Sequence, residues 1–264
     1  MHIAVCLAPI IDPKLPPIRL NLRSDGRDLK TDDLARQLGP FDQAALETAL
    51  KLRDADASVT ILALLFTGPD GKVAVQDVMS RRIEDTICIE PEDLEGWDIA
   101  AACQRFKCAI SELSCRPNLV LIGREFGDCD DGVFPALLAE ALAWPFVGHV
   151  HAIRRVGDEL VLRRDLDNTT EEYQFAGPVV ASITNHPSNR LRYPLMKDMM
   201  AAKKRTARTI RVRPTTAEAR VVPTSLEIVS FQERGAGRCR ILAGSPRAQA
   251  ETLAEFLAPW IVAP

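Results

Sequence analysis

Several common signatures are missing from this sequence, and each absence narrows the range of functions. The 264 residues contain no continuous run of about 18 apolar residues, so we expect no membrane-spanning segment. The first residues lack the basic region and the cleavage site of a secretory signal, which favours a cytoplasmic location. The formal net charge of −3 argues against a general nucleic-acid-binding protein.

Motifs for catalysis or metal binding are equally scarce. GxSxG, HExxH and GxxxxGK[ST] are all absent, and the seven cysteines include no CxxC pair, so reduced thiols are expected. The "DCDDG" stretch at 128–132 resembles the start of a calcium loop, but Ala139 stands where the bidentate glutamate would be needed. His149 and His151 alternate along an expected strand without an evident third metal ligand. The sequence therefore predicts no catalysis by an acid, base or nucleophile of its own.

The first 144 residues alternate between apolar runs and helical patterns. Strands are expected at 2–8, 58–65, 86–89 and 118–123, and helices at 42–55, 72–83, 98–114 and 131–143. Asp42 is expected to cap the first helix, and Pro135 lies in the first turns of the last one, where proline is tolerated. Strands that are apolar throughout and alternate with helices indicate an α/β fold of the nucleotide-binding, Rossmann-like kind: a parallel sheet with helices on both faces.

The pattern changes after Trp144. Residues 146–184 carry only strand signals, separated by turns, and predict an antiparallel addition built from hairpins. The rest of the chain is basic and proline-containing, with one last helix expected at about 246–258. We therefore expect an α/β domain over 1–184, followed over 185–264 by a loop and an extended C-terminal arm that packs on another molecule.

Ligands of open α/β sheets bind beyond the carboxyl ends of the strands. Here the corresponding loops are expected at 8–12, 67–71 and 123–132. Thr67 and Gly123 suit a close backbone approach to a nucleotide, and the third loop ends at a helix N-terminus, which favours an anion. However, Asp128 and Asp131 place negative charge at that end, where a phosphate would be repelled. Ordinary turn and capping chemistry explains the same residues, so the loops alone leave both interpretations open.

The stretch "HPSNRLRYPLMKDMMAAKKR", His186–Arg205, is the second candidate site and is called the 186–205 segment below. It presents Leu195, Met196 and Met199 beside a series of lysines. Methionine adapts to several partner shapes, and basic rims speed the encounter with a partner. An ordinary surface helix under a long loop would show the same pattern, so docking and a purely structural role remain open on these residues.

Taken together, these stretches resemble the β subunit of electron transfer flavoprotein. The resemblance covers about residues 2–212 and rests on "MHIAVCLAPIID", "GPFDQAALETALKL", "PNLVLIGREFGDCDDGVFPALLAEALAWP" and "LRRDLDNTTEEYQFAGPVVASITNHPSNRLRYPLMKDMMAAKKR". The last stretch is the most specific. The residues that fall on family positions there are Arg192, Tyr193, Met200, Ala202, Lys203 and Lys204.

The resemblance implies a heterodimer with an α subunit, and an electron carrier rather than an enzyme with its own acid and base. One FAD would lie mostly in the α subunit, accept electrons from a flavin-dependent dehydrogenase and pass them on. Phe41 would lie near its isoalloxazine ring. The resemblance also implies a site for a structural AMP, lined by Ala8, Thr67, Gly123, Asp128, Asp131 and Gly132. It further implies a dehydrogenase-docking loop formed by Tyr193, Leu195, Met196 and Met199.

The sequence departs from the family pattern at several of these positions. Gly39 replaces the asparagine before Pro-Phe, and Asp131 and Val133 replace a threonine and a glutamine that hold phosphate. The usual Met-Gly-Ala-Asp run after the second helix is Arg81-Arg82-Ile83-Glu84. A tyrosine often found near the flavin in the first loop is absent. These departures leave AMP binding open and motivate an alternative: a nucleotide-binding regulatory protein on the same scaffold without flavin function.

Overall fold

The computed structural model describes residues 1–16, 30, 34–83, 85–90, 99–127, 132–212 and 241–261. The chain forms two compact units, Met1–Ser225 and Leu226–Pro264, and each is described by itself.

The first unit is built on a seven-stranded sheet in the order β12-β5-β4-β1-β6-β11-β7. All neighbouring strands in it are parallel. The strands are β1 (His2–Leu7), β4 (Thr60–Phe66), β5 (Asp85–Ile89), β6 (Leu119–Gly123), β7 (Phe146–Val150), β11 (Val179–Ile183) and β12 (Arg208–Ile210). The central strands are apolar and buried on both faces, as the sequence predicts for a covered parallel sheet.

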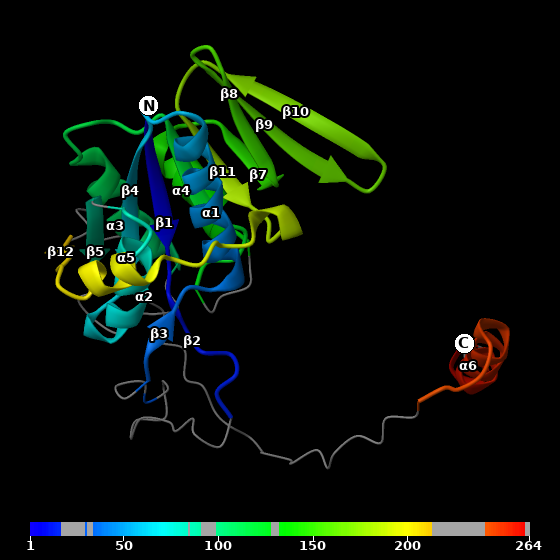
Figure 1. Ribbon diagram of the computed structural model, residues 1–264. Coiled ribbons are helices and arrows are strands. Elements are labelled where there is room, and N and C mark those ends of the chain that lie inside the picture. The colour runs from blue at the N-terminus through cyan, green and yellow to red at the C-terminus, as the bar shows by residue number, and fades with distance from the viewer. Residues whose placement is uncertain are drawn as a thin grey trace. The chain divides into compact units, whose positions relative to one another are not determined.

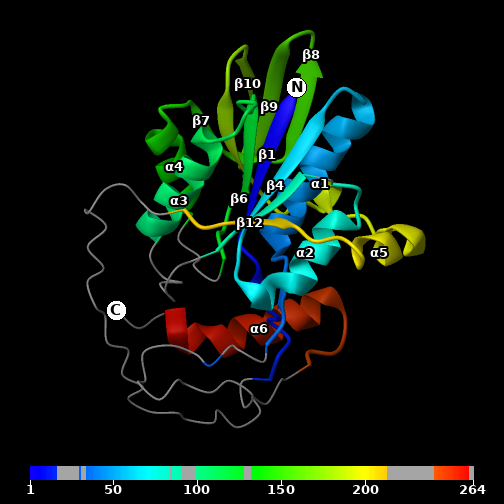
Figure 2. The same cartoon turned by 90° about the vertical axis from the view of Figure 1, so that its left-hand side faces the viewer.

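Helices cover both faces of this sheet, so the predicted α/β architecture is confirmed. Helices α1 (Pro40–Ala55) and α2 (Lys72–Met79) lie on one face, and α3 (Ile99–Ser111) and α4 (Phe134–Leu142) lie on the other (Figure 2). Each face has its own core. Leu46 and Leu50 of α1 pack in one, and Phe106 of α3 and Leu138 of α4 pack in the other.

The start of α1 corrects one expectation. The helix begins at Pro40 with Gly39 as its N-cap, so the prediction that Asp42 is the capping residue was wrong. Proline suits the first helical position because it has no N–H to leave unpaired and its φ already fits a helix. Asp42 is instead buried, and its Oδ2 accepts a hydrogen bond from the Ala8 N–H at 3.1 Å.

The prediction for residues 146–184 was right in part. Strands β8 (Ala152–Val156), β9 (Glu159–Leu166) and β10 (Thr169–Phe175) form a three-stranded antiparallel sheet. However, β7 and β11, which were assigned to the same antiparallel addition, are parallel members of the main sheet. The burial of β11 explains the error: all five of its residues are buried, as in a strand covered on both faces, whereas hairpin strands of an addition alternate.

The 186–205 segment connects β11 to β12. It contains the short turns of η3 (Pro187–Asn189) and α5 (Met196–Ala202), and Figure 1 shows it passing over α1 and α2 toward the far edge of the sheet. β12 then pairs with β5 in parallel. The expected boundary between a domain at 1–184 and an arm at 185–264 stays a prediction. However, β12 at 208–210 is part of the main sheet of the first unit.

The remaining elements of the first unit are small. β2 (Ile10–Ile11) and β3 (Arg36–Gln37) form a two-stranded antiparallel ladder, and η2 (Pro69–Gly71) follows β4. The second unit contains α6 (Pro246–Ile261), close to the helix expected at 246–258. Among the residues that the structure describes, no helix combines the length and the apolar character needed to cross a bilayer.

Candidate cofactor and docking sites

The expected ligand loops meet at one edge of the sheet. Ala8 directly follows β1, Thr67 directly follows β4, and Gly123 is the last residue of β6. These three strands are adjacent and parallel, so their carboxyl ends lie together. A Cβ built on Gly127 would lie 3.6 Å from the Cβ of Ala8, which places the loop after β6 against the loop after β1.

The third loop is described only in part. Asp128 and Asp131, both expected at the nucleotide site, lie outside the described residues. Gly132 has a φ of +65°, in the left-handed region, immediately before the N-cap of α4. Glycine is favoured in that conformation, so the backbone by itself accounts for a glycine at this position.

Three backbone donors at these strand ends have partners within the protein. They are Ala8 N–H to Asp42 Oδ2 (3.1 Å), Thr67 N–H to the Ile89 carbonyl (3.2 Å) and Arg124 N–H to the Ile183 carbonyl (2.9 Å). The Thr67 side chain is also buried, and its hydroxyl donates to the carbonyl of Gly68 at 3.3 Å. A phosphate bound by these three groups would therefore have to displace existing hydrogen bonds.

Two glycines of these loops are explained by their neighbours. A Cβ on Gly123 would lie 2.8 Å from the backbone carbonyl carbon and the Cβ of Phe41, closer than real Cβ contacts. A Cβ on Gly71 would lie 1.9 Å from the Thr67 Oγ1. Gly123 thus allows the first turn of α1 to pack on the end of β6, which was not part of its expected role.

Phe41 lies in the first turn of α1, and its side chain is half-buried. The guanidinium carbon of Arg124 lies over the ring, 5.0 Å from its centroid, at a distance typical of a cation–π contact. Arg124 also donates to Glu125 at 2.9 Å. The ring is therefore held by Gly123 at its base and by Arg124 on one face, in a fixed position at the carboxyl edge of the sheet.

Asp42 follows Phe41 in the chain and is buried. Its carboxyl group accepts hydrogen bonds from uncharged backbone N–H groups. Burial raises its pKa to about 7, although the backbone N–H groups of Ala8 and Gly39 act in the opposite direction. Its Oδ1 has no hydrogen-bond partner within the described part of the chain. The residue after Phe41 in the chain is thus a buried carboxyl group whose pKa is raised to near neutral pH.

The 186–205 segment exposes a patch of large apolar side chains. Met196 is 72% exposed, and Tyr193 is 85% exposed. The exposed patch consists of Tyr193, Leu195, Met196, Met199 and Met200. Lysines 197, 203 and 204 lie in the same stretch. The structure thus brings together all four residues expected to dock a partner and leaves their apolar surface uncovered.

The start of this segment is held on α1 by a network of charged residues. Arg192 binds the carboxylate of Glu47 through Nη2 at 2.7 Å and through Nε at 3.1 Å, and its backbone N–H donates to the same carboxylate at 3.1 Å. The Glu47 side chain is only 6% exposed. One turn further along α1, the Lys51 ammonium donates to the carbonyl of Ser188 and to Asn189 Oδ1.

The other end of the segment is held on the loop after α2. Arg82 donates from Nε to Asp198 of α5 at 3.0 Å, and Ala202 at the end of α5 is buried. Arg82 has a φ of +59°, in the left-handed region that favours glycine. The family resemblance implies glycine at this position, and Arg82 here combines a left-handed φ with a contact to the 186–205 segment.

The match to a family model decides the assignment of the chain. The model of the electron transfer flavoprotein domain matches residues 28–215, which include Phe41, the carboxyl-end loops after β4 and β6, and the whole 186–205 segment. The chain belongs to the electron transfer flavoprotein domain family.

Three curated proteins similar to the chain are identical to it at about a quarter of the aligned residues. The electron transfer flavoprotein subunit beta of Mycobacterium leprae is 28% identical over 175 residues, which are 64% of this chain and 64% of that protein. The match to this relative thus spans less than two thirds of its length. The subunit beta of Megasphaera elsdenii is 27% identical over 216 residues, 78% of this chain and 76% of that protein. The acryloyl-CoA reductase electron transfer subunit gamma of Anaerotignum propionicum is 24% identical over 201 residues, 76% of this chain and 73% of that protein.

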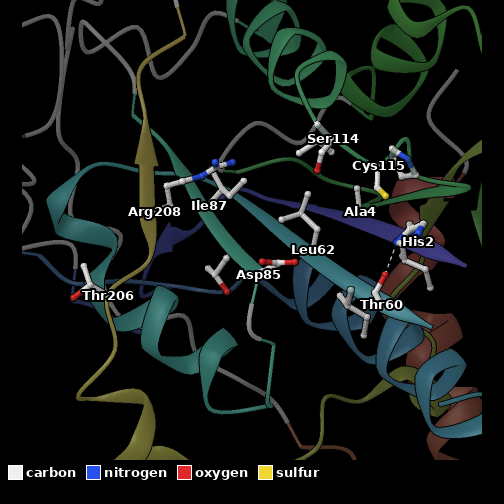
Figure 3. A pocket seen from close by; sticks show the side chains of 15 residues that line it. His2, Ala4, Thr60, Leu62, Asp85, Ile87, Ser114, Cys115, Thr206 and Arg208 are labelled. Atoms are coloured by element: carbon white, nitrogen blue, oxygen red, sulfur yellow. Dashed lines mark hydrogen bonds between the residues drawn. The ribbon is translucent and has the colours of Figure 1, made fainter. Parts of the chain in front are cut away.

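This family member also has a pocket at the opposite, amino-terminal end of its strands, with a volume of about 440 Å³. Figure 3 shows His2 and Thr60, joined by a 2.6 Å hydrogen bond, at one end of it and Thr206 and Arg208 at the other. None of the expected site residues lines this pocket. Within the described ranges no group of three or more His, Cys, Asp or Glu side chains could hold a metal ion, and His149 and His151 gain no third ligand.

Sequence reasoning missed the residues that position the two sites. Arg192 was noted for its family position, but its buried partner Glu47 was not singled out, because a glutamate on an amphipathic helix usually faces solvent. Arg124 was not singled out either. Its proximity to Phe41 depends on the contact between α1 and β6, which no local pattern reports.

Proposed function

We propose that this chain is the β subunit of a heterodimeric electron transfer flavoprotein. In this proposal FAD is held between the chain and an α subunit, accepts electrons from a flavin-dependent dehydrogenase and passes them to a further acceptor. The family match and the similarity to three electron-transferring subunits support it. The observation that carries it is the exposed patch, which lies on a firmly anchored segment inside the matched range.

The residues at the carboxyl edge fit a contact with one part of a flavin rather than a complete FAD pocket. Phe41 offers a half-buried apolar ring, and Arg124 offers a cation beside it. FAD supplies the redox chemistry when it is bound, and no acid, base or nucleophile of this chain is required. The role of Phe41 and Arg124 is to pack against the isoalloxazine and to exclude water from it. The α subunit provides the remaining contacts.

The C-terminal arm offers a second surface for the α subunit. Leu253, Phe256 and Leu257 of α6 are spaced as neighbours on one helical face, and all three are exposed. An exposed apolar face of this kind is used for partner binding in many helix-in-groove complexes. We propose that residues 241–261 pack on the α subunit, whereas the exposed patch of the 186–205 segment stays free for the dehydrogenase.

Co-expression with the candidate α subunit tests this function. A yellow complex with one FAD per pair is expected, and its flavin should be reduced by a flavin-dependent dehydrogenase in the presence of that enzyme's substrate. Met196→Glu should abolish this reduction without loss of FAD, because it places a charge at the centre of the docking surface. Val156→Glu is the matched control, because Val156 is a 46% exposed apolar residue on β8, outside the segment. A colourless pair would contradict the proposal.

The alternative, a nucleotide-binding regulatory protein without flavin function, remains a separate prediction. It requires a nucleotide site on this chain and predicts that Met196→Glu has no redox phenotype. The satisfied backbone donors after β1, β4 and β6 do not favour it, because a regulatory nucleotide would need free donors for its phosphates.

A further inference from the structure

Four phenylalanine side chains lie beneath the carboxyl-end loops. Phe66 is the last residue of β4, Phe106 is on α3, Phe126 is on the loop after β6, and Phe134 is the first residue of α4. We call them the phenylalanine cluster. Their ring centroids are separated by 3.6 Å for Phe126–Phe134, 5.4 Å for Phe106–Phe134, 5.6 Å for Phe106–Phe126, 6.0 Å for Phe66–Phe106 and 6.3 Å for Phe66–Phe126.

The cluster fills the interior of this part of the molecule. Phe126 and Phe134 stack with an interplanar angle of 9°, and their separation is the thickness of one aromatic ring, so nothing can enter between them. Phe106 and Phe134 are fully buried, and Phe126 is 5% exposed. Ala8, expected to line the adenine-nucleotide site, packs in the same core.

A bound nucleotide needs an apolar slot for its base and free donors for its phosphates. The apolar volume where the loops after β1, β4 and β6 meet is taken by Phe126 and its neighbours. The backbone N–H groups of Ala8, Thr67 and Arg124 are bonded to protein acceptors, and the Thr67 hydroxyl is turned inward. The described residues therefore do not fit the AMP that the family resemblance implies.

We infer that the stacked rings of Phe126 and Phe134 occupy the space of a structural nucleotide, so that this chain folds around its own side chains and binds no AMP at these loops. The inference rests on the proposed function, because AMP is expected only of a flavoprotein subunit of this kind. It leaves the flavin contact at Phe41 untouched, since that ring lies on α1 and is not part of the cluster.

The decisive experiment analyses the nucleotides of the purified pair of this chain and its α subunit. The protein is denatured, and released FAD and AMP are separated and quantified against the protein concentration. AMP added to a parallel sample before denaturation controls for recovery. We expect FAD without AMP. Equilibrium dialysis of the same pair against labelled AMP should likewise show no binding.

Each outcome separates this inference from the proposed function. One AMP per pair together with FAD would overturn the inference and leave the function standing, including the case in which residues 128–131 alone hold the nucleotide. AMP without FAD would overturn both. A pair that contains neither FAD nor AMP would contradict the proposed function and would agree with the inference.

A cavity variant tests whether the phenylalanine rings really fill an enclosed space. Phe126→Ala removes a buried ring, so benzene should raise the melting temperature of the variant but not that of the wild type, because apolar cavities bind small apolar molecules. Phe146→Ala is the matched control, since the Phe146 ring is 39% exposed and its loss encloses no cavity. If Phe126→Ala does not fold, Phe134→Ala is measured in the same way. A folded variant without a benzene effect would contradict the inference.

Discussion

Arg192 and Glu47 join the 186–205 segment to α1 through several hydrogen bonds to one carboxylate. Three donors of Arg192, two on the guanidinium and one on the backbone, converge on a carboxylate that is almost fully buried on α1. The pKa of the Arg192 guanidinium is raised, first by its hydrogen bonds to Glu47, so Arg192 keeps its positive charge. This ion pair is one of several polar contacts, with those of Lys51 and Arg82, that fix the orientation of the exposed patch.

Replacement of Glu47 by glutamine should loosen the segment. The variant leaves the guanidinium without its buried counter-charge, and we expect a loss of about 1–3 kcal/mol in the free energy of unfolding. Hydrogen exchange of residues 191–202 should become faster, while exchange in β1 and β6 stays as in the wild type. Asp54→Asn is the control, because Asp54 is a more exposed partner of Arg192 and should cost less. Unchanged exchange in 191–202 would show that the ion pair does not hold the segment.

Gly123→Ala should displace Phe41, although residue 123 itself is not expected to contact the flavin. The new Cβ would lie 2.8 Å from Phe41, so α1 must shift, and overpacking of this kind costs about 1–3 kcal/mol. We expect the flavin content of the purified pair to fall together with stability. Gly177→Ala is the matched control, because no atom lies within 4 Å of the Cβ it would add. Equal flavin content in the two variants would contradict the contact proposed for Phe41.

Asp42 should impose a pH dependence on stability. Its pKa is about 7 in the folded protein, well above that of a free carboxyl, so the folded state holds a proton that the unfolded state releases. Its contribution is therefore most favourable at acidic pH and is lost as pH rises from about 4 to about 7, by on the order of 4 kcal/mol at most. Side-chain hydrogen bonds lower the pKa of Asp56, Asp165 and Glu171, which act in the opposite direction.

The comparison of Asp42→Asn with the wild type isolates this group. The amide oxygen of asparagine can still accept from the Ala8 N–H but does not titrate. Relative to the wild type, the variant should gain stability in urea unfolding as pH rises from about 4 to about 7, as expected for a carboxyl with a raised pKa. A difference in stability that is the same at every pH would show that folding does not change the pKa of Asp42.

Arg82→Gly should stabilise the backbone and weaken the tether of α5. A residue other than glycine in the left-handed region costs about 1–2 kcal/mol, whereas the exposed ion pair with Asp198 contributes about 0–1 kcal/mol. We expect a net gain in the melting temperature. Arg82→Ala is the control, because it loses the ion pair and keeps the strained φ, so it should melt below Arg82→Gly. The reverse order would mean that the backbone strain at residue 82 is negligible.

Residue patterns predicted those parts of the structure that depend on local periodicity. The strands around Val5, Leu64 and Leu121 are buried on both faces, and such strands are recognisable because every position is apolar. The sheet membership of β7 and β11 was not predictable in this way, because parallel pairing joins segments distant in sequence. His149 has a left-handed φ, so the side chains of His149 and His151 do not follow the regular alternation of a strand. No residue pattern in the sequence predicts this φ.

The candidate sites were predictable to different degrees. Composition drew attention to the apolar residues around Met196 but left open whether they dock a partner, and the structure adds that they are exposed. The phenylalanine cluster did not, since Phe106 and Phe126 lie on different elements and only the packing of α3 against the loop after β6 brings them together. Asp131 and Val133 were singled out by family pattern, whereas the neighbouring Phe134, buried in the stack, was passed over as an ordinary helix residue.

Under the proposed function, the route of the 186–205 segment from β11 to β12 affects how the dehydrogenase is bound. A free terminal arm would have to lose much of its conformational freedom on docking, but this segment is closed at both ends by strands of one sheet. The segment loses most of its conformational entropy when the protein folds, not when it binds a partner. Binding therefore has a smaller entropic cost to offset, and a small contact area is enough for a weak, short-lived complex. A carrier that must release its donor in order to reach its acceptor benefits from that arrangement, because rapid turnover between partners requires specificity without tight binding.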